Sequence, residues 1–346
     1  MANDGAPHRA AYPEGMARSH LTLAALATAA VADLDVSAAA PYGSPTGGDY
    51  DSALLNGRLG EHWIIRVPRS QRAEARQSAD LVSLRALSAG VRGRLPFAVP
   101  QYRGQAPLGR TRGIVYDFIA GEHVPASRVT PDSGLPAVVG RGIAAIHSLP
   151  TSFVTDAGLT SHTPFEAMRS TASLVDRAAS TRLLPAALLE RWEAAIQDHL
   201  LWQFQPTVVN GALDAGSILV SGGDVTGVLG WHELHVGDPA RDLAWLLGTP
   251  SSVDEAFDAY NAERGSSDHQ LRHRATLYHE LELAKWLLHG TSTKSTEVVD
   301  DAVELMGGLV DSLQLDRSGA IGAGQTAALD IDGVEKLLST TERRHG

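Results

Sequence analysis

Carboxylate and imidazole side chains gather between residues 206 and 247, and these residue types could carry chemistry. Asp214 and Glu233 lie in predicted loops, and His232 and His235 stand on either side of the glutamate. A carboxylate can accept a proton or bind a metal ion, and a histidine can do either. No sharper metal-ligand spacing connects these four residues, so the pattern favours a partly exposed loop over a metal centre.

The same segment contains a predicted helix start. Asp238 precedes Pro239, and Asp242 follows within one turn. Aspartate at a helix N-cap accepts backbone amide hydrogen bonds, and proline is suited to the first turn. An acidic residue in the first turn is also favoured by the helix dipole. Asp238 is therefore predicted to cap a helix over 239–247.

Composition excludes several classes of protein. Of 346 residues, 43% are hydrophobic, which is enough for a packed core and excludes a wholly disordered chain. The formal net charge is −11, and a general nucleic-acid binder would normally carry a basic surplus. Because the chain has no cysteine, it can have no disulfide, no zinc site built on thiolates and no cysteine nucleophile.

Lysine is scarce in this chain. Only Lys285, Lys294 and Lys336 occur among the 29 basic residues. Any mechanism that needs a lysine in the first 284 residues is therefore excluded.

No segment is predicted to cross a membrane. The longest apolar stretch runs from Leu21 to Ala32, whereas a bilayer-spanning helix needs about 20 residues. A signal peptide is a weaker interpretation, because no convincing apolar core and cleavage site follow Arg9 and Arg18. A cytoplasmic protein without a membrane partner is expected.

The first third of the chain is predicted to be rich in strands. Helices are expected at 18–33 and 70–89, since apolar residues recur there at helical spacing. Strands and turns are expected over 36–68, and a further strand over 113–119.

The remainder is predicted to be mainly helical. One pair of strands, 217–220 and 225–229, interrupts this part, and a Gly/Ala/Ser-rich linker at 316–328 precedes a short helix near 330–341. The helices are expected at 135–148, 164–180, 184–203, 239–247, 252–262, 268–289 and 296–313. Strands followed by helices indicate an α+β fold with two lobes.

The order of motifs between 206 and 247 resembles the aminoglycoside and macrolide phosphotransferase family. The chain reads Pro-Thr-Val-Val-Asn-Gly-Ala-Leu-Asp-Ala-Gly-Ser, then Val-Leu-Gly-Trp, then Val-Gly-Asp-Pro-Ala-Arg-Asp. The family has His-Gly-Asp, four residues and Asn, a strand pair ending Ile-Asp-Trp, and then Gly-Asp-Pro. The resemblance implies a protein-kinase-like fold with a small antiparallel N-lobe sheet and a mostly helical C-lobe.

The resemblance implies four parts of the chain. They are a disordered N-terminus at 1–17, a nucleotide-side N-lobe at 18–119, a helical C-lobe at 120–315, and a linker with a C-terminal tail at 316–346.

The family's catalytic residue types are absent at the matching positions. His-Gly-Asp, which carries the base, falls on Asn210, Gly211 and Ala212. The asparagine that helps to hold magnesium falls on Ser217, and the second metal-binding aspartate falls on Gly230.

The phosphate-binding lysine of the family falls on Arg66. Macrolide-type members often resemble this Arg-Val-Pro form. The helix acid that pairs with this cation falls near Asp80, with Glu74 as an alternative register.

These replacements remove both base and metal chemistry. Phosphoryl transfer needs a carboxylate to orient the acceptor hydroxyl and metal ions to neutralise the phosphates. Ala212 cannot accept a proton, Gly230 has no side-chain oxygen, and Ser217 is shorter than asparagine. No metal site is therefore expected.

Two displaced carboxylates could rescue activity. Asp214 lies two residues beyond Ala212, and Glu233 lies three beyond Gly230. A solvated loop carboxylate is the favoured interpretation of both.

The remaining candidates on the nucleotide side would bind through backbone groups. Gly47 and Gly48 lie where the family's nucleotide-covering loop would be, although an ordinary hairpin tip explains them equally well. The segment Tyr116 to Gly121, which includes Ile119, resembles the hinge, where an adenine needs no particular side chain. Binding of ATP or GTP without magnesium therefore stays open.

Two further family positions have simpler interpretations. His147 is expected to be a packed, hydrogen-bonded histidine below the catalytic loop. Glu280 or Glu282 could meet a cationic acceptor, although exposed helix faces are usually acidic in a chain of this charge.

The leading hypothesis is a phosphotransferase-fold protein that has lost its kinase activity, a pseudokinase that binds a small molecule or a protein partner. The alternative is an active small-molecule kinase, for an antibiotic or a metabolite, that uses ATP or GTP and displaced carboxylates. A purely structural module without a pocket is the weakest of the three.

Overall fold

The computed structural model describes residues 18–43, 48–123, 130, 133–248, 252–265, 268–315 and 321. The segment 1–17, almost all of 316–346 and the helix predicted near 330–341 lie outside these ranges.

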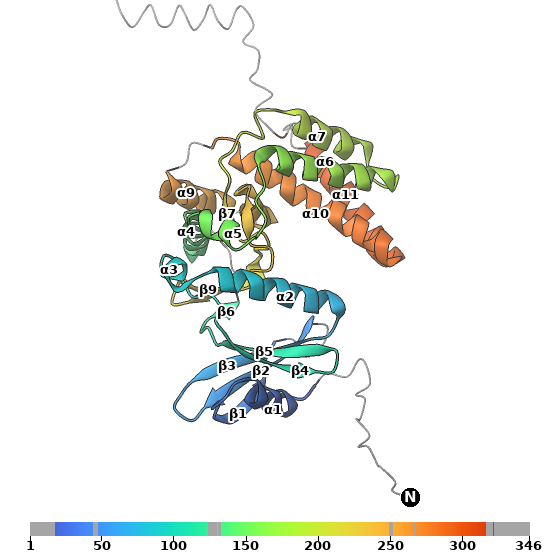
Figure 1. The fold of residues 1–346 in the computed structure, drawn as a ribbon. Helices are drawn as coiled ribbons and strands as arrows, with labels where there is room; N and C mark the ends of the chain where they lie inside the picture. The colour runs from blue at the N-terminus through green and yellow to red at the C-terminus, as the bar shows by residue number, and fades with distance from the viewer. Residues whose placement is uncertain are drawn as a thin grey trace, which may run out of the picture.

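A five-stranded antiparallel sheet forms the N-terminal part (Figure 1). Its strands lie in the order β1-β2-β3-β5-β4. They are β1 (Val36–Pro41), β2 (Tyr50–Gly57), β3 (His62–Pro68), β4 (Tyr102–Leu108) and β5 (Thr111–Asp117).

One face of the sheet is covered by α1 (His20–Ala30), as Figure 1 shows. Side chains alternate along β2 and β3, so that Leu55 and Ile65 are buried on this face. Leu23 of α1 packs among them in a small apolar cluster.

Helix α2 (Gln71–Ala86) lies between the sheet and the helical part of the molecule, and the short α3 (Ala89–Arg92) follows it. Ser70 caps α2, because its hydroxyl accepts the amide of Ala73 at 3.1 Å. Leu81 and Leu84 of α2 belong to the larger apolar cluster, which continues into the C-terminal helices. The larger cluster therefore spans both lobes, and the smaller one lies between α1 and the sheet.

Strand β4 is absent from the sequence prediction, and its composition explains why. It contains Gly104 and Pro107, which normally argue against a strand. Because β4 is the edge of the sheet, its proline removes no hydrogen bond that a further strand would need.

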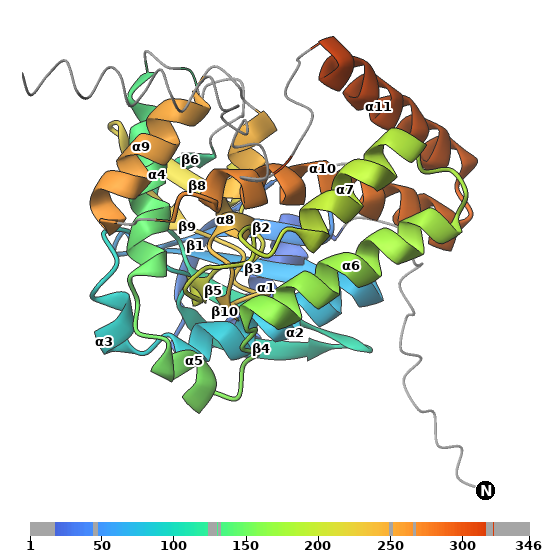
Figure 2. The same ribbon diagram turned by 90° about the horizontal axis from the view of Figure 1, so that it is seen from above.

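The C-terminal part is mostly helical (Figure 2). Helices α6 and α11 pack on α10, and α7 packs on both α6 and α11. The helices are α4 (Leu135–His147), α5 (Ser152–Asp156), α6 (Pro164–Ser180), α7 (Ala186–Gln197), α8 (Ala240–Leu243), α9 (Val253–Arg264), α10 (Leu271–Thr293) and α11 (Thr296–Leu315), with the 3-10 helix η4 (Ala244–Gly248) after α8.

Short strands position the loops that the sequence singles out. Strands β7 (Thr207–Val209) and β10 (His235–Gly237) pair antiparallel, as do β8 (Ile218–Ser221) and β9 (Asp224–Val228). Strand β6 (Glu122–His123) pairs with β8. The loop at 210–217, which ends in the 3-10 turn η3 (Ala215–Ser217), therefore runs from β7 to β8, and the loop at 229–234 runs from β9 to β10.

The fold confirms the predicted α+β architecture with two lobes and corrects two local predictions. Helix α7 ends at Gln197, short of the predicted residue 203. Helix α8 begins at Ala240 with Pro239 as its cap residue, so Asp238, the predicted N-cap, lies one position before the cap that the structure assigns. Within the described ranges, no helix has the length and apolar character needed to span a bilayer.

Candidate functional site

The loop at 210–217 is held from behind by a buried carboxylate. Asp242 of α8 is fully buried and accepts the amides of Asn210 and Gly211, each at 2.7 Å. Two charge-assisted bonds from one carboxylate fix the loop backbone firmly.

His147 supports Asp242 in turn. Its Nε2 lies 3.1 Å from Asp242 Oδ2, and its Nδ1 lies 2.8 Å from the hydroxyl of Tyr260. The packed, hydrogen-bonded histidine expected at this position is confirmed. It positions the loop and does not face the cavity.

The front of the loop has no base at the matching position. Ala212 presents a methyl group to a cavity, and its amide donates to Asn210 Oδ1 at 3.1 Å. Asn210 itself is fully buried, so its amide side chain serves the loop and not a ligand.

Ser217 is bound to its own loop. Its hydroxyl donates to the carbonyl of Asp214 at 2.7 Å and accepts the amide of Asp214 at 2.9 Å. The Asp214 carboxylate accepts the amide of Ser217 at 2.7 Å, which completes a reciprocal cap of η3. Asp214 is exposed, as predicted, but one of its carboxylate oxygens is already bonded to the Ser217 amide.

Gly230 has no carboxylate and adopts a left-handed backbone with φ of +69°. Any other residue at this position would be strained. The next amide, that of Trp231, donates to Asp80 Oδ1 of α2 at 2.7 Å.

Asp80 and not Glu74 is the acid of α2 that faces the loops of the C-terminal part. Burial raises the pKa of its carboxyl, although the Trp231 amide and the charges of Arg66 and His232 act in the opposite direction. Glu74 lies in the first turn of α2.

Arg66 does not form the ion pair that the resemblance implies. Its guanidinium lies 4.8 Å from the ring centroid of Tyr50, and within the described residues no ion pair joins it to Asp80. The helix acid is bonded to the Trp231 amide instead.

The hinge retains an open backbone donor. The amide of Phe118 donates to the His62 carbonyl, whereas the amide of Ile119 has no acceptor among the described residues. Gly121 has φ of +150°, and a Cβ there would lie 2.5 Å from the Thr226 hydroxyl. Glycine is therefore needed for the hinge to pack on β9.

The nucleotide-covering loop is described only in part. Gly47 lies outside the described residues, and the carbonyl of Gly48 accepts a long bond of 3.4 Å from Arg69.

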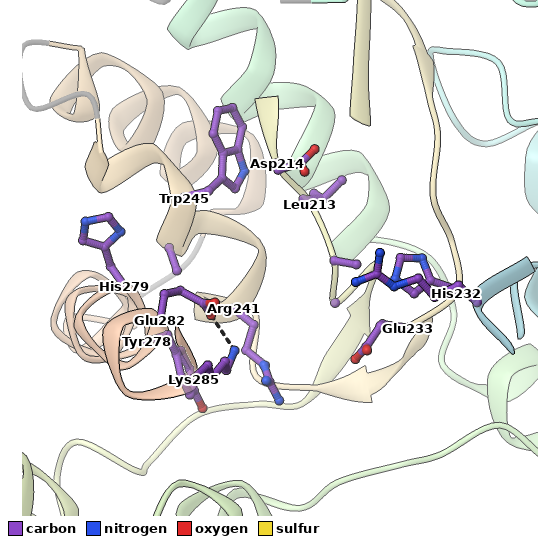
Figure 3. Close-up of a pocket in the computed structure, with 14 residues that line it drawn as sticks. Leu213, Asp214, His232, Glu233, Arg241, Trp245, Tyr278, His279, Glu282 and Lys285 are labelled. Carbon is purple, nitrogen blue, oxygen red and sulfur yellow. Dashed lines mark hydrogen bonds and ion pairs between the residues drawn. The ribbon is translucent and has the colours of Figure 1, made fainter. Parts of the chain in front are cut away.

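A cavity of about 440 Å³ opens in front of Ala212 (Figure 3). Its walls come from α2, the two loops at 210–217 and 229–234, α8, η4 and α10. The lining residues are Arg76, Gly211, Ala212, Leu213, Asp214, His232, Glu233, Arg241, Ala244, Trp245, Tyr278, His279, Glu282 and Lys285.

Glu280 and Glu282, the two acids that the sequence offers for a cationic acceptor, have different surroundings in the structure. Glu282 lines the cavity and forms an ion pair with Lys285. Glu280 is buried and turned toward α7, where it binds Arg191 at 2.9 Å and the indole of Trp192 at 2.9 Å. Glu280 is therefore a packing residue and cannot meet an acceptor.

The cavity also holds cations that sequence reasoning does not identify. Arg76 and Arg241 both line it, from α2 and α8. Arg241 lies between Asp238 and Asp242, two residues that match the family motif. This position in the motif is the sequence feature that could have identified it as a site residue. Burial lowers the pKa of His279, although the charges of Glu280 and Glu282 act in the opposite direction.

The residues present do not fit a magnesium ion. The hydroxyl of Ser217 is used within its loop, Gly230 offers no oxygen, and Ala212 offers no carboxylate. Among the residues that the structure describes, no group of three or more His, Asp or Glu side chains could hold a metal.

Comparison with known proteins gives a family match. The model of the phosphotransferase enzyme family matches residues 43–278. A curated relative, "Uncharacterized protein YcbJ" of Bacillus subtilis (strain 168), is 24% identical over 211 residues, which are 57% of this chain. The match spans 66% of the length of that relative.

Two solved structures show the fold. The macrolide 2'-phosphotransferase MphH from Brachybacterium faecium is 22% identical, with a TM-score of 0.69 over 82% of this chain and 97% of its own. The GDP complex of wild-type aminoglycoside 2'-phosphotransferase-IIIa is 17% identical, with a TM-score of 0.69 over 84% and 98%. The chain therefore has the kinase-like phosphotransferase fold.

Proposed function

The chain belongs to the phosphotransferase enzyme family, and we propose that it is a pseudokinase of that family, which binds a small molecule or a protein partner without transferring phosphate. The observation that carries this proposal is that Ala212 faces the cavity on a loop whose backbone is still fixed by Asp242.

The absence of a base and of magnesium ligands explains why the proposed pseudokinase transfers no phosphate. Loss of a positioned base alone typically costs about 10²–10⁴ in rate. Gly230 and Ser217 add the loss of the groups that would hold magnesium, whose charge neutralisation phosphoryl transfer requires. Water cannot replace a charged base and two metal contacts together.

ATP or GTP without magnesium remains the proposed nucleotide. The support is the open amide of Ile119 at the hinge, together with the nucleotide complexes of family members with this fold. Arg66 is the cation on the phosphate side of the proposed nucleotide site. Its guanidinium lies over the Tyr50 ring, and this contact competes with binding to phosphate.

A second candidate function follows from two carboxylates in the same cavity. Asp214 and Glu233 both line it beside Ala212, and Glu233 is exposed. An active kinase for an antibiotic or a metabolite could use either of them as a displaced base.

A turnover assay separates the two candidates. The purified chain is incubated with ATP or GTP, magnesium, and macrolides or aminoglycosides, and release of ADP or GDP is compared with a control without enzyme. We expect no release above the control. Robust turnover that disappears in Asp214→Ala or Glu233→Ala would establish the active kinase and overturn the proposal.

A further inference from the structure

We infer that the cavity in front of Ala212 takes a zwitterion, a small molecule with an ammonium group and a carboxylate at the two ends of a short, largely apolar body. The inference rests on the proposed function, because it names the ligand class of the same site. It follows from which charged groups in the cavity already have partners.

The cavity is balanced in formal charge. Three carboxylates and three permanent cations line it: Asp214, Glu233, Glu282, Arg76, Arg241 and Lys285. An aspartate at position 212 would add a fourth negative charge and favour a cationic ligand. With alanine there, a polycation such as an aminoglycoside finds no net attraction.

Two cations and two acids of this set already have partners. Lys285 is paired with Glu282 on α10, and Arg76 binds Asp49 at 2.9 Å. Asp214 caps η3 through one carboxylate oxygen. A ligand gains least from groups whose charges are already compensated.

Arg241 is the cation that lacks a carboxylate. Its guanidinium has no hydrogen bond or ion pair with any described residue and lies 5.4 Å from the ring centroid of Tyr278. The Tyr278 hydroxyl donates to Asp238 at 3.0 Å, and Asp238 is bound by Arg274 at 2.8 Å. This buried chain of hydrogen bonds holds the ring on which Arg241 lies, and the guanidinium can donate to a ligand carboxylate.

Glu233 is the acid that lacks a cation. Its carboxylate has no partner among the described residues, while its backbone carbonyl is fixed by His235 Nδ1 at 2.6 Å. Figure 3 shows the Glu233 and Arg241 side chains entering the cavity from opposite sides, one from the loop at 229–234 and one from α8. An ammonium near one and a carboxylate near the other would compensate both charges.

The cavity also has apolar lining that suits the body of such a ligand. Ala212, Leu213, Ala244 and Trp245 contribute to it. A volume of about 440 Å³ falls within the range of about 300–1,000 Å³ found for small-molecule sites.

Calorimetry with a graded series of probes tests this inference. The probes are ω-amino acids from glycine to 6-aminohexanoate, which scan the spacing between ammonium and carboxylate. Hexylamine and hexanoate serve as controls with a single charge. We expect one zwitterion to bind at least tenfold more tightly than either control.

Variants then assign the two ends. Arg241→Gln and Glu233→Gln should each weaken binding of the best zwitterion at least tenfold. Arg272→Gln is a matched control, because this guanidinium also stacks on a ring, that of Phe257, but lies outside the cavity. Glu263→Gln removes an exposed acid outside the cavity. Both controls should change affinity less than twofold.

The outcomes separate this inference from the proposed function. If no zwitterion binds more tightly than the single-charge controls, the inference is wrong, and the proposed loss of phosphotransfer stands. If ATP and magnesium phosphorylate a hydroxyl-bearing analogue of the best zwitterion, the proposed loss of activity is wrong, and the ligand class stands. A variant that loses binding is scored only if its circular dichroism spectrum matches the parent protein.

Discussion

The back and the front of the loop at 210–217 differ sharply. Behind it, Asp242 and Asp238 are buried, and all of their described contacts are structural. In front of it, the corresponding positions hold a methyl group and a glycine, Ala212 and Gly230. The residues that hold the backbone of this loop are therefore distinct from those at its front, and on the proposed function the chain keeps only the first group.

Removal of Asp238 should have the largest effect. It accepts the Ala240 amide at 3.0 Å and binds Arg274 and the Tyr278 hydroxyl, and both Asp238 and Arg274 are almost completely buried. Asp238→Ala leaves a buried charge partly uncompensated, so we expect a loss of about 3–5 kcal/mol in the free energy of unfolding. Urea denaturation measures it. A loss below 1 kcal/mol would show that Asp268 alone satisfies the arginine.

Asp242→Asn should have a smaller effect. The amide side chain keeps one acceptor oxygen, so only one of the Asn210 and Gly211 amides loses its partner. A buried donor left unsatisfied costs about 1–3 kcal/mol. Hydrogen exchange should be faster at the amide that loses its partner, and unchanged protection of both amides would contradict the positioning role.

Asp214→Ala tests the front of the loop. The change removes the cap on the Ser217 amide, which is worth about 0.5–2 kcal/mol. The thermal melting temperature should fall less than for Asp238→Ala. An equal or larger fall would mean that the exposed face of the loop is as structural as its buried face.

Asp80→Asn should be neutral or slightly stabilising at pH 7. Burial raises the pKa of this carboxyl above its ordinary value of 3.8, so ionisation disfavours the folded state. The folded state then loses stability as the pH rises from the ordinary pKa of aspartate through the raised pKa of Asp80. Asparagine does not ionise, so the variant avoids that loss. Below pH 3.8 the two proteins should be equally stable in denaturation experiments. A clear destabilisation at pH 7 would instead assign a structural role to the charge.

Much of the fold could be predicted, because its signals are local. The strand pair at 217–220 and 225–229 follows from short apolar runs around a Gly-Gly turn, and the structure places β8 and β9 there. The strand order of the sheet and the edge position of β4 depend on contacts between distant segments. Those contacts leave no periodic signal in one sequence.

The sequence predicts which catalytic residue types are missing from the candidate site, but not the contacts within the site. The alanine at 212 and the glycine at 230 can be read in the sequence, and their spacing to Asp238 identifies them as the family's catalytic positions. The partner of Asp238 is Arg274, 36 residues later on another helix, so the sequence suggests only a local cap. Similarly, the bond from Trp231 to Asp80 joins residues 151 positions apart.

Nucleotide binding measured by calorimetry, with and without magnesium, tests the central claim most directly. The claim is that neither of the family's metal-binding positions can hold the metal here, since Ser217 is used within its loop and Gly230 has no side-chain oxygen. We predict that magnesium changes the affinity for ATP or GTP by less than tenfold. A tightening of tenfold or more, equal to about 1.4 kcal/mol, would contradict the account.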